Sequence, residues 1–452
     1  MKYKNPHGSK KYAVAPLSLI ALAGGAAPAM ASGFALNLQS AEALGAATAG
    51  AQATPATPGN AYFNPASIVG VEGMETSLSF IGVLNDTSYE NANAALFGVV
   101  PVAGDTAGEG IIGDAVIPTG AAAVKLSDHL FAGVALYAPF GFNTEYDDTS
   151  ALRYHGTYSQ VVSGVIQPML GVSFGGWSIA AGPKFEYVDI DLEGAIDAAG
   201  IESALLMTMA IPGTDDASVD VSANDWGTGF VVGLQGHVGH RLTVGASFSS
   251  KVEHSLSGTA AFDISTSTSG QTLSGLAGLF QDTGVTSSFT TPANIQFGLN
   301  YEVNDKTRVL ASATQTRWKS FDQLVLNFEN PAQPAETTTQ NWKNTWAGAV
   351  GVERDFGPSQ TVRLGVMYED DPANPDFSSP RVPGASRVWL AAGYSRDLSE
   401  RAKLHLAASY AIAETTPLNE SAAYPENLFR GSVTGETDIS GFVAAVGVDW
   451  RF

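Results

Sequence analysis

This chain of 452 residues lacks cysteine and has few charged residues. It contains no cysteine, which excludes disulfide bonds, thiolate metal sites and a cysteine nucleophile. Charged residues make up only 15% of the chain, and the 23 basic residues are outnumbered by 44 acidic ones. Because proteins bind nucleic acids through clustered lysines and arginines, this balance argues against a nucleic-acid partner.

Recognisable catalytic motifs are missing as well. None of the seven histidines has a recognisable Ser-His-Asp setting, and the chain contains no H-E-x-x-H or other cluster with metal-ligand spacing. These absences argue against a lipase, a protease or a metalloenzyme. We therefore expect no enzyme activity, no catalytic residue, no cofactor and no metal site.

Long apolar runs are absent beyond the N-terminus. The first residues combine several lysines, the apolar run AVAPLSLIALAGG and the small-residue site Ala29-Met30-Ala31, which together predict a secretion signal peptide over residues 1–31. A transmembrane anchor is the alternative, but the apolar run is short and contains Pro16. No later segment supplies the roughly 18 consecutive apolar residues of a membrane helix, so we expect export without a helical span.

Short segments in which apolar and polar residues alternate recur along the rest of the chain. In 361–368, for example, Val362, Leu364 and Val366 share one face, and Arg363 lies on the other. This period of two predicts β-strands with one apolar and one polar face. A soluble two-sheet sandwich and a membrane barrel would both show it, so the period alone leaves the fold open.

The two faces of these segments favour the barrel. The polar faces carry small or uncharged side chains with occasional bases, as a barrel lumen would. Tryptophans gather at the ends of the predicted strands, where the aromatic girdles of membrane barrels lie. These tryptophans are Trp177, Trp226, Trp318, Trp342, Trp389 and Trp450.

The lengths of the connections provide an independent test. Short turns such as Ser127-Asp128-His129 and Gly175-Gly176 alternate with long segments such as 192–224 and 256–287. Outer-membrane barrels have short periplasmic turns and long outer loops, whereas a sandwich gives no reason for this alternation. With about fourteen strands counted, we predict an all-β fold, a fourteen-stranded antiparallel transmembrane β-barrel over residues 74–452 in a Gram-negative outer membrane.

Residues 32–73 do not follow the alternating pattern. They are rich in Ala, Gly and Pro, and are too apolar for a free tail and too irregular for a strand. We predict that they form an N-terminal hatch that plugs the barrel lumen. A periplasmic linker is the alternative.

Several short motifs, in a fixed order, resemble one family. They are Gly33-Phe34-Ala35-Leu36, the hatch motif Asn64-Pro65-Ala66, the stretch PFGFNTEY (139–146), Trp226-Gly227-Thr228-Gly229, and Pro372, Arg381, Pro383, Arg387 and Trp389 in the segment 370–394. Each is weak alone, but together they cover nearly the whole mature chain. In order and spacing they are similar to the outer-membrane long-chain fatty-acid transporters of the FadL/TodX type, whose relatives import aromatic hydrocarbons. The resemblance implies a monomeric barrel with an N-terminal hatch, in agreement with the strand count.

The resemblance also implies a route for the cargo. In such transporters an apolar ligand sits first in a groove between outer loops, then in a pocket inside the barrel, and leaves sideways at a kinked third strand. Here Pro139, Phe140 and Gly141 interrupt the alternating segment 130–145. Because proline cannot donate to a sheet ladder, we predict a lateral gate at these three residues; an ordinary β-bulge is the alternative.

Two of the predicted outer loops are unusually apolar, and apolar surface on a loop is costly unless it binds something. Packing of the two loops on each other is the alternative. The candidate substrate-binding residues are Leu205, Leu206, Met207, Met209 and Ile211 in one loop, Leu273, Leu276, Leu279 and Phe280 in the other, Phe34 and Leu36 in the hatch, and the bases Lys184 and Arg363.

One departure from the family bears on the cargo. Where its best-studied members hold a fatty-acid carboxylate with bases, this chain reads VDIDLEG (188–194) and AETTTQ (335–340), and neither stretch contains a base. Lys184 and Arg363 would supply positive charge, unless they only pair with acids. A carboxylate in an apolar pocket without a base would bind poorly. We therefore expect uptake of hydrophobic compounds, with long-chain fatty acids as the first candidate and uncharged hydrocarbons or aromatic compounds as the alternative.

Other functions are less favoured. A general porin would have an open, charged lumen without a hatch. An adhesive barrel would use acidic loop pairs as cation sites, but those pairs also suit solvated surface charge, or divalent ions that bridge lipopolysaccharide: Asp147-Asp148, Asp215-Asp216 and Asp370-Asp371. The expected partners are thus a hydrophobic small molecule and outer-membrane lipid with lipopolysaccharide.

Overall fold

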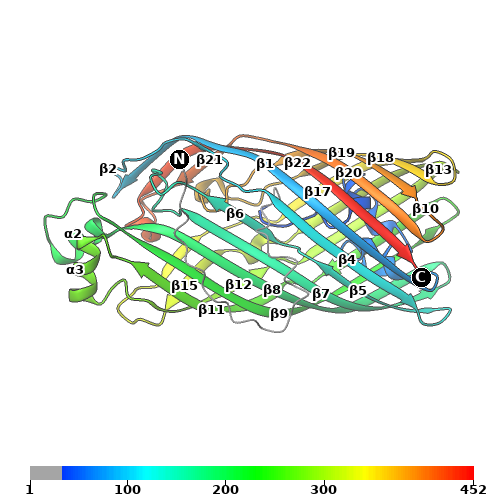
Figure 1. The fold of residues 1–452 in the computed structure, drawn as a ribbon, viewed down its shortest axis with the longest axis horizontal. Helices are drawn as coiled ribbons and strands as arrows, with labels where there is room; N and C mark the ends of the chain where they lie inside the picture. The colour runs from blue at the N-terminus through cyan, green and yellow to red at the C-terminus, as the bar shows by residue number, and fades with distance from the viewer. Residues whose placement is uncertain (1–32) are drawn as a thin grey trace.

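The chain folds into a closed antiparallel β-barrel of fourteen strands (Figure 1). The computed structural model describes residues 33–452, so the signal peptide predicted over residues 1–31 lies outside the described residues. The barrel closes where β1 (Met74–Leu96) pairs antiparallel with β22 (Ser432–Arg451). The predicted fold class and number of strands are confirmed.

Each strand of the barrel is one long element or two consecutive elements separated by a kink. Between β1 and β22 these elements are, in chain order, β4 (Ala115–Lys125), β5 (Leu130–Tyr137) with β6 (Gly141–Glu145), β7 (Tyr158–Phe174), β8 (Trp177–Asp197), β9 (Asp216–Val238), β10 (Leu242–Ser249) with β11 (Val252–Asp263), β12 (Thr283–Thr291) with β13 (Asn294–Asn304), β14 (Thr307–Thr316), β17 (Thr345–Asp355), β18 (Gln360–Glu369), β19 (Arg387–Asp397) and β20 (Ala402–Ala413). Short strands extend the hairpins: β2 (Val100–Pro101), β3 (Gly108–Glu109), β15 (Gln323–Phe328), β16 (Glu336–Thr339) and β21 (Thr416–Glu420).

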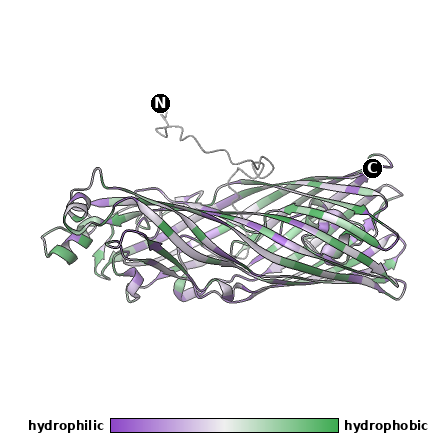
Figure 2. Cartoon of the chain, turned by 90° about the horizontal axis from the view of Figure 1, so that it is seen from below, coloured by the Kyte–Doolittle hydropathy of each residue, from purple (hydrophilic) through white to green (hydrophobic). Residues whose placement is uncertain are grey.

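The alternating pattern of the sequence decides which side chains face the lumen. In β18, Leu364 and Val366 are exposed on the outer wall, whereas Arg363 and Met367 are buried inside. An apolar outer face suits contact with lipid, and a polar inner face suits a barrel interior. Figure 2 shows apolar and polar residues mixed along the strands, as this alternation requires. Among residues 33–452, no helix is long and apolar enough to cross a membrane.

Short turns and long loops lie at opposite ends of the barrel. Gly175-Gly176 joins β7 to β8, at the end of the barrel where the chain ends. The long loops at the other end carry α2 (Ala198–Leu206) and α3 (Thr268–Ala277), which project beyond the strands at the left of Figure 1. Because outer-membrane barrels have short periplasmic turns and long outer loops, the helical end is the outer end.

The tryptophans divide into two groups. Trp226 and Trp450 are exposed on the outer wall, as girdle residues would be. Trp318, Trp342 and Trp389 are instead fully buried inside the molecule. The girdle prediction is wrong for these three, because a position at a strand end does not reveal whether the side chain faces lipid or the lumen.

The N-terminal segment, residues 33–73, lies inside the barrel (Figure 1). It approaches the inner face of strands on opposite sides of the wall. A Cβ at Gly245 of β10 would lie 1.8 Å from the backbone oxygen of Gln52, and one at Gly393 of β19 would lie 2.5 Å from the Cα of Gly45. Glycine is therefore needed at both wall positions to let the segment pack closely.

The N-terminal segment is built from short helical turns rather than strands. Its elements are α1 (Ala41–Leu44), η2 (Ala51–Ala53), η3 (Pro58–Asn60) and η4 (Pro65–Ile68), and the loops hold three more turns, η5 (Trp318–Ser320), η6 (Pro375–Phe377) and η7 (Pro425–Asn427). In η4, the Asn64 side chain caps the turn by accepting from Ala66 N at 2.9 Å, and donates to the backbone oxygens of Gln52 and Leu234. The Asn64-Pro65-Ala66 motif thus joins the segment to β9.

Candidate functional site

The third barrel strand is interrupted between β5 and β6, as the sequence led us to expect. The ladder between β4 and β5 runs from Lys125↔Phe131 to Gly120↔Leu136 and ends there. Beyond this point β6 pairs with β7 on its other side. The wall is therefore broken between the outer half of β4 and the third strand, at residues 138–140.

The N-terminal segment supplies hydrogen bonds that the broken ladder lacks. Leu36 N donates to Pro139 O at 2.7 Å, and Gly141 N donates to Phe34 O at 2.9 Å. Unpaired backbone groups are expensive at membrane depth, so these bonds stabilise the break from the lumenal side. The segment and the break therefore depend on each other.

Gln39 spans the break. Its Nε2 donates to Ala138 O at 2.5 Å, and its backbone oxygen accepts from Thr119 Oγ1 of β4 at 2.9 Å. A small cavity beside it, with a free volume of only about 10 Å³, is lined by Thr119, Leu136 and Tyr137 among others. Leu136 is also exposed on the outer wall, so the cavity lies against the wall of the barrel.

Phe34 sits at the centre of a buried cluster of aromatic side chains. Its ring centroid lies 4.6 Å from that of Trp318 and 5.4 Å from that of Trp342. Gly33 precedes it with a φ of +63°, and a Cβ there would lie 2.5 Å from the Trp342 ring, so only glycine fits. The other rings within 6.0 Å of Phe34 belong to Phe140, Phe142, Phe289 and Phe321.

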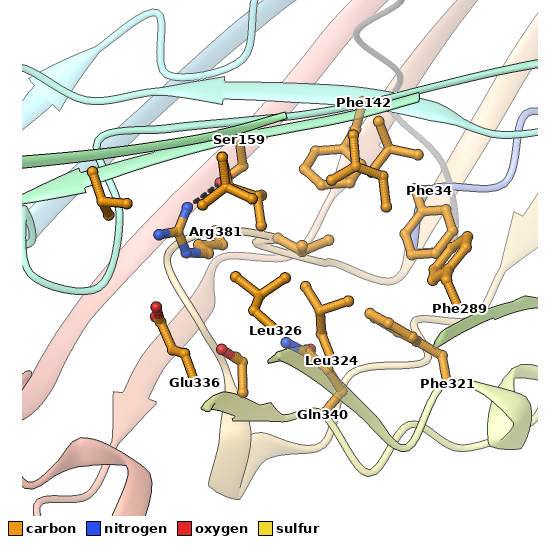
Figure 3. A pocket seen from close by; sticks show the side chains of 17 residues that line it. Phe34, Phe142, Ser159, Phe289, Phe321, Leu324, Leu326, Glu336, Gln340 and Arg381 are labelled. Carbon is orange, nitrogen blue, oxygen red and sulfur yellow. Dashed lines mark hydrogen bonds between the residues drawn. The ribbon is translucent and has the colours of Figure 1, made fainter. Parts of the chain in front are cut away.

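An apolar cavity, called the inner pocket below, opens beside Phe34 (Figure 3). Its free volume for a water-sized molecule is about 50 Å³, well below the roughly 300–1,000 Å³ of small-molecule sites, so lining side chains must move to admit a ligand. Aromatic rings line one end, aliphatic side chains line the middle, and Arg381 with Glu336 lines the other end. The residues between are Ser159, Val161, Ile190, Leu192, Val219, Val221, Leu324, Leu326, Thr338, Gln340 and Val382.

Arg381 provides a positive charge at the polar end of the inner pocket. It lies in the outer loop between β18 and β19, and its Nη1 donates to Tyr158 O at 3.0 Å and to Ser159 Oγ at 2.9 Å. Burial lowers the pKa of Arg381 to about 10, so the guanidinium stays protonated at neutral pH. A Cβ at Gly156 would lie 2.7 Å from the guanidinium carbon, so that glycine makes room for it.

A second cavity, the outer groove, leads from the outer loops to the inner pocket. Its free volume is about 600 Å³, and it shares Val219, Glu336 and Arg381 with the inner pocket. Its lining combines apolar side chains such as Ile201 and Phe280 with polar ones. The two cavities therefore adjoin at these three residues.

The half of the lumen near the short turns is polar. A cavity there, with a free volume of about 290 Å³, is lined by charged and polar side chains that include Glu42, His237, Glu302, Arg308, Glu353, Arg363 and Lys403. Arg363 pairs with Glu42 of the N-terminal segment at 2.6 Å and with Glu353 of β17 at 2.5 Å. Arg308 pairs with Glu353 at 2.5 Å. This network ties the N-terminal segment to the barrel wall.

The structure separates the predicted substrate-binding residues into groups. Phe34 lines the inner pocket and Phe280 lines the outer groove. Leu273 and Leu279 are buried between α2 and α3, and Leu206 packs against them. The remaining loop residues are exposed and outside both cavity linings: Leu205, Met207, Met209, Ile211 and Leu276.

Three further candidates lie outside the inner pocket and the outer groove. Leu36 is buried in a neighbouring apolar cluster. Lys184 Nζ lies 3.2 Å from Glu186 Oε2, and Arg363 belongs to the network described above. Both bases are therefore ion-pair partners in this structure. Phe140, expected at a gate, is buried and packs against Phe34 from the lumenal side.

Sequence reasoning did not assign Phe142, Phe289, Phe321 or Arg381 to the pocket. The phenylalanines come from three separate parts of the chain, and only the closed barrel brings them together. The sequence contains one indication that Arg381 is functional, which is its position in the motif-bearing segment 370–394. Its loop folds back to reach the pocket, which no local pattern encodes.

Comparisons with known proteins agree with this architecture. Residues 22–452 match the family described as outer membrane protein transport protein (OMPP1/FadL/TodX). The chain belongs to this family. It is thus an outer-membrane transport protein and not an enzyme, as the sequence predicted.

Individual relatives cover most of the chain. A putative outer membrane protein of Neisseria meningitidis serogroup B is 27% identical over 83% of this chain and 84% of its own length. The long-chain fatty acid transport protein of Escherichia coli K12 is 23% identical over 87% of this chain and 90% of its own length. The crystal structure of a Pseudomonas aeruginosa FadL homologue matches with a TM-score of 0.85 at 20% identity, covering 93% of this chain and 100% of the homologue. At that identity the structural match supports the fold alone.

Proposed function

We propose that this protein imports hydrophobic compounds, with long-chain fatty acids as the first candidate. The cargo binds in the outer groove, moves into the inner pocket and leaves sideways at the break beside Pro139. The observation that carries this proposal is the shared lining of the two cavities, which leads from the outer loops to Phe34 and the break. The N-terminal segment acts as the hatch of this path.

The polar half of the lumen supports a lateral exit. To continue straight through the barrel, an apolar molecule would have to pass the N-terminal segment and the charged network around Arg363. Displacing hydration and hydrogen bonds from such groups without replacing them is costly. The break in the wall lies before that network and offers the shorter apolar route to the membrane.

The two ends of the inner pocket favour two classes of cargo. Arg381 suits a carboxylate, because a guanidinium can bind it with two parallel hydrogen bonds. The ring-lined end around Phe34, Phe289 and Phe321 equally suits an aromatic hydrocarbon, which packs well against aromatic faces and edges. Uncharged hydrocarbons are therefore the second candidate cargo.

The variant Pro139→Val with Gly141→Val tests the lateral exit. The valine at 139 restores a backbone donor, so the ladder with β4 can continue and close the break. We expect fatty-acid uptake to fall at least about tenfold while the barrel still folds, as judged by its heat-modifiable migration on gels. Val134→Ala, in the paired part of β5, is the matched control. Normal uptake by the double variant would overturn the proposal.

A further inference from the structure

Five large apolar side chains on the two helical loops point into solvent. Their exposed fractions are 55% for Leu205, 91% for Met207, 98% for Met209, 65% for Ile211 and 76% for Leu276. We call these residues the loop-tip patch. Leu205 and Leu276 lie on α2 and α3, and the other three follow α2 in its loop. Isolated exposed apolar residues are common, but several in two neighbouring loops usually mark a contact surface. Figure 2 shows apolar segments in these loops at the outer end.

The fold does not use the loop-tip patch. The helices α2 and α3 are held together by a separate cluster of buried residues, which comprises Ala198, Ala217, Leu273, Leu279 and Phe280. None of the patch residues belongs to this cluster or to the lining of the outer groove. Side chains this exposed contribute little packing energy to the fold. Polar residues at these positions would therefore leave the loops at least as stable.

The backbone conformation of Met207 indicates that the patch serves a function outside the fold. It ends α2 with a left-handed backbone, at a φ of +53°, where glycine is the usual residue. A methionine there is strained by its Cβ, and its side chain gains nothing inside the protein because it is almost fully exposed. Methionine is flexible and polarizable, which suits contact with irregular apolar surfaces.

The charge of the two loops limits which kind of surface they can bind. Residues 198–215 contain Glu202 and Asp215, residues 264–282 contain Asp282, and neither stretch contains a lysine or arginine. An anionic partner, such as a phosphate-rich lipid surface, would be repelled rather than bound. An uncharged apolar surface meets no such penalty.

We propose that the loop-tip patch docks the protein on a neutral apolar liquid surface, such as a hydrocarbon droplet. The inference rests on the proposed function. It adds that the cargo arrives as a droplet rather than as dissolved molecules. Ile201 of α2 and Phe280 line the outer groove, so cargo from a docked droplet enters the groove from the same pair of loops. Docking raises the local cargo concentration at the groove far above the solubility of the monomer in water.

Flotation with an emulsion tests the docking directly. Proteoliposomes that carry the full chain are mixed with hexadecane droplets, and the fraction that floats is measured. We expect the variant Met207→Ser/Met209→Ser/Ile211→Ser to reduce this fraction about fivefold, because three large apolar contacts are lost. Leu398→Ser, which removes a side chain that is 58% exposed at the opposite end of the barrel, is the matched control and should not change it.

Two results would overturn the docking. One is flotation of the triple variant equal to that of the unmodified chain. The other is stronger flotation with droplets coated with phosphatidylglycerol, since the acidic loops should weaken that contact. Flotation needs no transport, so it decides the docking even where the unmodified chain takes up no hydrocarbon and the proposed function fails.

Uptake provides the second readout. The same radiolabelled hydrocarbon is supplied either as droplets or as monomer below its solubility limit. The ratio of droplet uptake to monomer uptake should fall about fivefold in the triple variant. An unchanged ratio would overturn the proposal. The patch would then affect uptake from droplets and from dissolved monomer equally, or affect neither.

Discussion

Arg381 decides the charge of the inner pocket. A guanidinium carries five N–H donors in a fixed fork, and the bonds of Nη1 to Tyr158 O and Ser159 Oγ use only part of them. Glu336, the acid that lines the same end of the pocket, forms an ion pair with Arg430 at 3.2 Å. The pocket thus offers an anchored cation at one end of an otherwise apolar cavity.

Replacing Arg381 by methionine should separate the two classes of cargo. The variant keeps an apolar stem of similar length but loses the charge. We expect affinity for a long-chain fatty acid to fall about tenfold or more, whereas affinity for an alkane of the same length should stay within about twofold. Displacement of a fluorescent fatty acid and of a labelled alkane measures the two affinities. Equal losses for both ligands would contradict a head-group role.

Arg363 should matter for stability instead. It neutralises Glu42 and Glu353 in a buried network, so Arg363→Met leaves Glu42 without its partner. We expect the free energy of unfolding in urea to fall by about 3–5 kcal/mol, the usual cost of breaking a buried pair. Lys343→Met breaks an exposed pair with Asp370 and is the control, with an expected loss of at most about 1 kcal/mol. A similar small loss for Arg363→Met would contradict the structural role.

At the scale of elements, the break in the third strand and the N-terminal segment form one device. The strand leaves backbone groups without a ladder partner, and the segment provides partners through Phe34, Leu36 and Gln39. Movement of the segment would remove these bonds and open the wall at the same time. In the proposed lateral exit, this device links occupancy of the inner pocket to access to the membrane, because Phe34 lines that pocket.

Removing the side-chain bond of Gln39 should loosen this device. Gln39→Leu leaves Ala138 O without its bond from Nε2, while the packing volume is roughly kept. We expect hydrogen–deuterium exchange of the amides around 138–141 to accelerate about tenfold, since the two buried hydrogen bonds of Nε2, to Ala138 O and to Leu36 O, are lost. Gln52→Leu, which removes a bond to Gln296 elsewhere in the segment, is the matched control. Equal acceleration in both variants would mean that the whole segment loosens.

The elements also show what could be predicted from the sequence. Alternation such as that in 361–368 depends only on neighbouring residues, and so the strands and the break at Pro139 could be located. The direction in which loop residues face depends on packing across the barrel. Trp318 and Trp342 looked like lipid-facing girdle residues but surround Phe34. Met207, predicted to bind cargo in an outer-loop groove, is exposed and lies outside the lining of the outer groove. Local patterns contain no information on such contacts.

The whole molecule divides the lumen into an apolar outer half and a polar inner half. The outer half contains the groove and the inner pocket, where the N-terminal segment contributes Phe34. The half near the short turns contains later residues of that segment, such as Glu42, and the charged network around Arg363. The break in the wall lies at the boundary, beside Phe34 and Gln39. In the proposed function, apolar solutes move as far as this boundary and leave into the membrane there.

Photolabelling of the path tests this central claim most directly. A long-chain fatty acid with a photoreactive group at its apolar end is supplied to cells, and the labelled residues are mapped by mass spectrometry. The account predicts labels on Phe34 and Phe289 in the inner pocket, and on Phe140 and Leu136 at the break. Labels on residues that line the polar cavity near the short turns, such as Glu302, with none at the break would contradict lateral release.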